Sequence, residues 1–136
     1  MNLNIILIFS IIFIISLNAC GPSALLDPNA CRKCKQFETN LIIKNSTSIF
    51  VENITLSYGQ NNDGCNFAVL QCSNPTAREI TIQWYGPSGT NIGATGAVQN
   101  TQQAIGLITC NENSQWISTE IGVIRIVETA TCEYTR

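Results

Sequence analysis

The sequence predicts an all-β fold, a small antiparallel β-sandwich stapled by about three disulfides. Seven cysteines occur among 136 residues, and in an exported chain they should be oxidised. Short runs of β-branched and aromatic residues alternate with clusters of Gly, Pro, Asn and Asp, which is typical of short strands joined by turns. No amphipathic helix pattern follows the N-terminal apolar segment.

The first 19 residues are predicted to form a secretory signal peptide. Residues 5–17 form an apolar run that only Ser10 and Ser16 interrupt. As a helix this run would span roughly 20 Å, which is short of the ~30 Å hydrocarbon core of a bilayer. Small and polar residues follow, with cleavage expected after Ala19. We therefore expect a secreted, extracellular protein with no membrane span after cleavage.

Residues 20–30 are expected to form an N-terminal lead-in, and residues 31–136 a single β domain. Strands are expected at residues 41–43, 48–56, 65–72, 78–85, 104–110, 115–119 and 121–132. The clearest period of two is at Ile80, Ile82 and Trp84, which alternate with polar residues and should face the core. Asp63-Gly64 predicts a tight turn, and residues 86–103 a turn followed by a loop.

Six of the cysteines are predicted to form intramolecular disulfides. They are Cys31, Cys34, Cys65, Cys72, Cys110 and Cys132. Six cysteines allow 15 pairings, and the sequence does not choose among them. The seventh, Cys20, lies at the signal boundary: it could leave with the signal peptide, remain as a free or intermolecular thiol, or carry lipid, as in a bacterial surface lipoprotein.

Cys31-Arg-Lys-Cys34 has the spacing of a redox motif, so a secreted thiol-disulfide oxidoreductase is the alternative function. That chemistry needs the first cysteine at a helix N-terminus in a βαβ unit, and no strand pattern precedes Cys31. The sequence favours two half-cystines that pair elsewhere in the domain. A zinc site is not expected, because neither a histidine nor a second Cys-x-x-Cys is present.

Composition narrows the function classes further. The formal net charge is −2, with no basic footprint for nucleic acid. There is no histidine, and no pair of carboxylates is spaced for acid–base chemistry or calcium binding. We expect no metal, no cofactor and no enzymatic activity, but a module that binds an extracellular protein or glycan. Asn45 and Asn53 begin sequons and are predicted glycosylation sites.

The cysteine pattern resembles the nematode six-cysteine extracellular domain over residues 31–132. The matching positions are Cys31-x-x-Cys34, Asp63-Gly-Cys65, Cys72, Gly106-Leu-Ile-Thr-Cys110, Trp116 and Cys132. The resemblance implies a secreted or cell-surface module and supplies no active site. The spacing of Cys72, Trp84 and Cys110 is also similar to immunoglobulin domains, but Ile108 stands where their tyrosine corner requires Tyr, so only the sandwich architecture is taken from that comparison.

Overall fold

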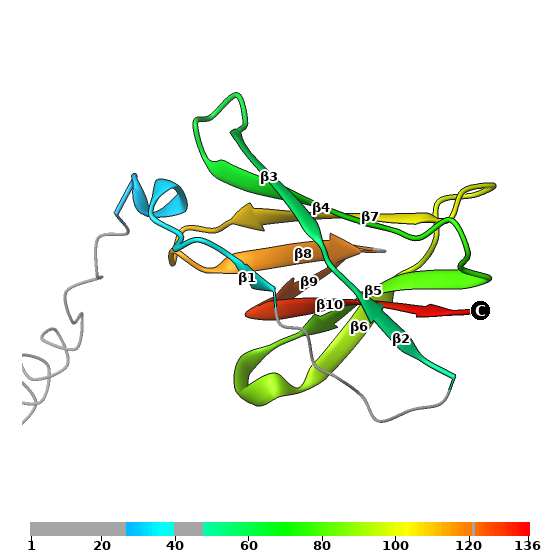
Figure 1. Ribbon diagram of the computed structural model, residues 1–136. Helices are drawn as coiled ribbons and strands as arrows, with labels where there is room; N and C mark the ends of the chain where they lie inside the picture. The colour runs from blue at the N-terminus through cyan, green and yellow to red at the C-terminus, as the bar shows by residue number, and fades with distance from the viewer. Residues whose placement is uncertain (1–26, 40–47, 121) are drawn as a thin grey trace, which may run out of the picture.

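The computed structural model describes residues 27–39, 48–120 and 122–136. They form two β-sheets packed face to face, together with two short 3-10 turns, Ala30–Arg32 and Pro87–Gly89. Figure 1 shows the two layers and the short N-terminal turn at one end of them. The predicted all-β sandwich with three disulfides is therefore confirmed.

The first layer, called sheet B, is fully antiparallel, with strand order β3-β4-β7-β8-β9. Its strands are β3 (Thr55–Gln60), β4 (Asn66–Ser73), β7 (Gln103–Cys110), β8 (Trp116–Glu120) and β9 (Val123–Ile126). Asn61 and Asn111 organise two of its turns, because each side-chain carbonyl accepts hydrogen bonds from backbone N–H groups two and four residues later. These turns place β4 and β8 beside their neighbours.

The second layer, called sheet A, has strand order β1-β10-β5-β6, with β2 also on β10. Its strands are β1 (Glu38–Thr39), β2 (Phe50–Glu52), β5 (Glu79–Tyr85), β6 (Asn91–Thr95) and β10 (Thr129–Thr135). β10 pairs with β5 along one edge, and with β1 and then β2 along the other. The β1–β10 pair is parallel, the one departure from antiparallel pairing among the described strands.

The core lies between the sheets and confirms the predicted alternation in β5. Ile80, Ile82 and Trp84 are each at most 2% exposed. A disulfide between Cys72 of β4 and Cys132 of β10 joins the two sheets through this core, and both cysteines are fully buried. An immunoglobulin-like disulfide would join Cys72 to Cys110. Here Cys72 bonds to Cys132, and Cys110 bonds to Cys34.

Four strand predictions need correction. The strand expected over residues 48–56 is two strands, β2 and β3, in different sheets, and Figure 1 shows them as one long ribbon that passes from layer to layer. The strand expected over residues 121–132 is likewise divided between β9 and β10. β6 occupies part of the expected loop, where its small residues hide the strand pattern, and β1 (Glu38–Thr39) lies in a stretch where no strand was expected. The strand expected at residues 41–43 lies outside the described residues.

Candidate functional site

Two disulfides fix the segment after the N-terminal 3-10 turn to one end of sheet B. Cys31 bonds to Cys65 at the start of β4, with 4.9 Å between their Cα atoms. Cys34 bonds to Cys110 at the end of β7, with a Cα–Cα distance of 5.9 Å. The two cysteines of the Cys-x-x-Cys motif therefore do not pair with each other, which is the structural arrangement that the sequence favours. Three disulfides indicate an oxidising compartment.

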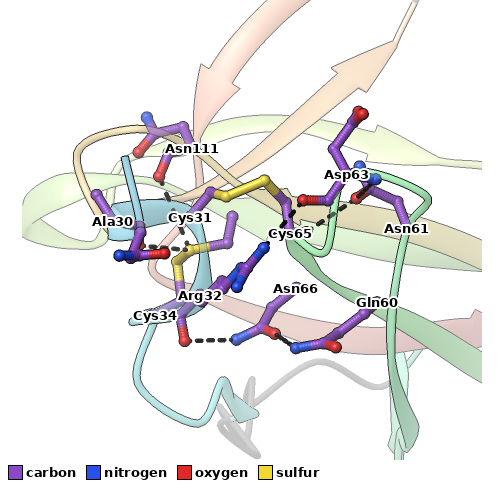
Figure 2. Close-up of a disulfide and its surroundings, with 12 residues drawn as sticks. Ala30, Cys31, Arg32, Cys34, Gln60, Asn61, Asp63, Cys65, Asn66 and Asn111 are labelled. Atoms are coloured by element: carbon purple, nitrogen blue, oxygen red, sulfur yellow. Dashed lines mark hydrogen bonds between the residues drawn. A yellow bond between two sulfur atoms is a disulfide. The ribbon is translucent and has the colours of Figure 1, made fainter. Parts of the chain in front are cut away.

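Hydrogen bonds hold the same segment along its length. The Trp116 indole Nε1 donates to the Lys35 carbonyl at 2.8 Å. The Phe37 backbone N–H donates to the Tyr58 hydroxyl at 3.0 Å. The Asn66 carboxamide donates to the Arg32 carbonyl at 2.9 Å, and Figure 2 shows Asn66 reaching toward this segment beside the Cys31–Cys65 bond. Disulfides and side chains from β3, β4 and β8 thus shape one fixed wall.

Between this wall and sheet B lies a hollow of about 520 Å³, called here the Tyr58 hollow. Its lining residues come from the N-terminal segment, β3, β4 and β8. They are Cys34, Lys35, Gln36, Tyr58, Gly59, Gln60, Asn66 and Trp116. Tyr58 is 47% exposed, and its ring lies 6.2 Å, centroid to centroid, from the Trp116 ring. The hollow therefore offers an aromatic surface whose hydroxyl is already bonded to backbone.

Three carboxamides surround the aromatic surface. The Gln60 Nε2 donates to the Asn66 Oδ1 at 3.2 Å, which orients both side chains, as Figure 2 shows. Gln36 is exposed, and within the described part of the chain no hydrogen bond occupies its carboxamide. A carboxamide donates and accepts at the same time, so it can pair with a hydroxyl in either sense.

The Tyr58 hollow contains one charged residue, Lys35, and no carboxylate among its lining residues. Glycoside hydrolysis needs a pair of carboxyl groups, and general acid–base chemistry needs a titratable group at the reacting atoms. The lining residues are therefore the polar and aromatic groups that bind a polar ligand.

A second hollow of about 680 Å³ is lined in part by the Cys31–Cys65 disulfide and includes three acidic residues, Asp27, Asp63 and Glu112. Lys33 forms an ion pair with Asp27. The hydrogen bond from the Lys33 side chain is the main cause that holds the pKa of the Asp27 carboxyl below its usual value. The hydrogen bond from the Asn29 backbone N–H lowers this pKa further. Within residues 27–39, 48–120 and 122–136, no three His, Cys, Asp or Glu side chains gather as metal ligands would.

The predicted modification sites are placed as follows. Asn53 is exposed in the two-residue link between β2 and β3, and its backbone N–H donates to the Glu52 carboxylate at 3.2 Å. Asn45 and Cys20 lie outside the described residues. In the part of the chain that the structure describes, no helix has the length and apolar character needed to cross a membrane.

Sequence reasoning missed the Tyr58 hollow, although Trp116 was among the residues it considered. The hollow depends on contacts between distant residues: Tyr58 bonds to Phe37, 21 positions away, and Trp116 to Lys35, 81 positions away. One local signal was present, the alternation of Leu56, Tyr58 and Gln60 on one face of β3. Comparisons of the chain with protein-family models, with curated proteins and with solved structures find no match.

Proposed function

We propose that this protein is an exported, non-enzymatic glycan-binding domain, and that the Tyr58 hollow holds a pyranose ring of the glycan. The observation that carries the proposal is the exposed Tyr58 ring, surrounded by three carboxamides in a hollow without a carboxylate. Ligand sites commonly combine apolar or aromatic walls with a few placed polar groups, and this hollow has that composition.

The chemistry of a pyranose fits these groups. One face of the ring carries mostly C–H bonds, which pack on an aromatic surface, while its edge carries neighbouring hydroxyls. Gln36 and the oriented Gln60–Asn66 pair can each donate to one hydroxyl and accept from another. Tyr58 keeps its ring available because its hydroxyl is bonded to the backbone of Phe37.

Rigidity also supports binding at this place. The wall of the hollow is held by the Cys34–Cys110 disulfide and by the indole hydrogen bond from Trp116. Since ordering a loop on binding costs free energy, a wall that is fixed beforehand preserves more of the small binding energy of a sugar. A ligand of about 12 non-hydrogen atoms at about −0.3 kcal/mol each corresponds to a dissociation constant on the order of 1 mM.

Export is part of the same proposal. Its support is the predicted signal peptide together with three disulfides, which form and persist in oxidising compartments. The assignment to the nematode six-cysteine class stays a prediction that rests on the order of the cysteines, because no family model matches the chain.

Titration of sugars into the disulfide-intact protein tests the function. A glycan array selects the probe, and calorimetry or NMR titration with the corresponding mono- and disaccharides then measures affinity. We expect Gln36→Ala and Tyr58→Leu each to weaken binding at least several-fold. The matched control is Gln71→Ala, which removes an exposed carboxamide from the outer side of β4 and should change nothing. The proposal is wrong if no glycan binds, or if the two hollow variants bind as well as the wild type.

A further inference from the structure

The N-terminal segment that forms one wall of the Tyr58 hollow also forms a wall of a third hollow. This third hollow, called here the Gln115 hollow, measures about 420 Å³. Its remaining lining comes from the turn before β8, from the end of β9 and from the link between β9 and β10. It includes Ser114, Gln115, Ile126, Val127 and Glu128. Ligand sites measure about 300–1,000 Å³, so each of the two hollows is large enough to hold part of a ligand.

The Tyr58 hollow and the Gln115 hollow adjoin each other. Lys35, Gln36 and Trp116 line both of them. Beyond these shared residues, β3 and β4 line the first hollow, whereas residues at β8, at β9 and after β9 line the second, and these strands lie at opposite ends of sheet B. The exposed residues Lys35 and Gln36, called here the Gln36 ridge, therefore lie between the two hollows. A chain molecule that leaves one hollow across this ridge enters the other.

Hydrogen bonds through Trp116 fix the two hollows relative to each other. Its indole Nε1 donates to the Lys35 carbonyl at 2.8 Å, and its own carbonyl accepts from the Val127 backbone N–H at 2.9 Å. The Glu128 backbone N–H donates to the Tyr85 carbonyl of β5 at 2.8 Å. The ridge and the far wall of the Gln115 hollow are thus attached to the same residue, so their spacing is set before any ligand binds.

The Gln115 hollow combines an aliphatic surface with hydrogen-bonding groups. Ile126 is 38% exposed, and the Gln115 carboxamide is exposed as well. Within the described part of the chain, no hydrogen bond or ion pair occupies the exposed Glu128 carboxylate, and carboxylates form strong hydrogen bonds with hydroxyl donors. Two lysines and two glutamates line the hollow, so their formal charges cancel: Lys33, Lys35, Glu38 and Glu128. These groups suit a neutral, hydroxyl-rich unit.

We propose that the Gln115 hollow is a second subsite for the same glycan, and that a linear oligosaccharide binds across the Gln36 ridge with one unit in each hollow. The second unit is neutral. The Gln36 carboxamide lines both hollows and can bond to hydroxyls of either unit. This inference rests on the proposed function, because the Tyr58 hollow places the first unit.

The linkage between the two units determines the gain in affinity. Once the first unit is bound, the second meets its subsite as part of the same molecule, at a high effective concentration. The fixed spacing of the hollows adds no ordering cost to this second contact. We therefore expect an oligosaccharide that spans both hollows to bind at least about tenfold more tightly than the monosaccharide.

Calorimetric titration of the full, disulfide-intact protein with a length series tests the second subsite. The probes are the mono- to tetrasaccharides of the glycan that binds best on the array. Affinity should rise with chain length and reach a plateau once both hollows are filled. Gln115→Ala and Glu128→Gln should each remove at least several-fold of this gain, and both should leave monosaccharide affinity unchanged because neither residue lines the Tyr58 hollow.

Glu112→Gln is the matched control, because Glu112 is an exposed glutamate that lines neither of the two hollows. It should show the wild-type gain with chain length. An affinity that does not depend on length, while Tyr58→Leu still weakens binding, would overturn the second subsite and leave the proposed function intact. A gain that both Gln115→Ala and Glu128→Gln leave unchanged would overturn it as well. Absence of binding at every length would overturn the proposed function and the second subsite together.

Discussion

The Trp84 indole of sheet A lies directly over the backbone of Gly106 in sheet B. A Cβ atom added to Gly106 would lie 2.5 Å from Cζ2 and 2.7 Å from Cη2 of the Trp84 ring. The largest fully buried side chain of the described core therefore needs a residue without a side chain opposite it.

Substitution of Gly106 by alanine should destabilise the domain. The ring is only 1% exposed and cannot move toward solvent without opening the core, so the extra methyl group overpacks the sheet interface. We expect a loss of about 1–3 kcal/mol in the free energy of unfolding, measured by denaturant titration with disulfides intact. The control is Gly96→Ala, because an added Cβ there meets no atom within 4 Å. Equal stability of the two variants would contradict the prediction.

This pair also shows how far sequence reasoning reaches. The alternation around Trp84 predicted correctly that the ring faces the core, because a half-buried strand requires a period of two. Nothing local in the sequence indicated which residue lies opposite, since Gly106 is 22 positions away and its role depends on how two sheets pack. The disulfide pairing was unpredictable for the same reason, and the Tyr58 hollow depends on that pairing.

The exposed apolar residues Ile105 and Leu107, on the outer side of β7, had a local signal that was not used. In β7 both alternating sets are apolar or small, with Ala104 and Ile108 inward and Ile105 and Leu107 outward. A strand that is apolar on both sides is typical of a sheet covered on both faces. The sequence of β7 therefore lacks the clean alternation expected of a strand with one side in water.

The buried Cys72–Cys132 disulfide should resist reduction longer than the Cys34–Cys110 disulfide, one cysteine of which is partly exposed. Cys72 and Cys132 are fully buried between the sheets, whereas Cys34 is partly exposed beside the Tyr58 hollow. Thiol attack needs access to sulfur, so Cys34–Cys110 should be reduced before Cys72–Cys132 under native conditions. Alkylation at increasing reductant followed by peptide mass mapping measures the order. Labelling of Cys72 and Cys132 before Cys34 and Cys110 would contradict this prediction.

Asn53 should carry an N-linked glycan when the protein passes through a eukaryotic secretory pathway. Its side chain is exposed in the link between β2 and β3, so the acceptor amide is accessible to the modifying enzyme. Intact mass before and after enzymatic deglycosylation should reveal the modification, and peptide mapping should place it at Asn53. Asn53→Gln should remove the mass of this glycan and leave the free energy of unfolding nearly unchanged. An unmodified Asn53 peptide from such a source would refute the prediction.

Lys35 should make the Tyr58 hollow prefer a sugar that bears a carboxylate or sulfate over its neutral counterpart. Its ammonium is the single charge among the lining residues, so an anionic group on a bound pyranose would gain an attraction that a neutral one lacks. Exposed ion pairs contribute about 0.2–1 kcal/mol, which corresponds to roughly 1.4- to 5-fold in affinity, and salt weakens them. Lys35→Gln should remove this preference and leave binding of the neutral sugar unchanged, as measured by paired titrations at low and high salt. Lys33→Gln is the matched control, because the Lys33 ammonium is paired with Asp27 and does not line the hollow. Equal loss of the preference in both variants would mean that the general charge of the surface, and not the site, attracts the anion.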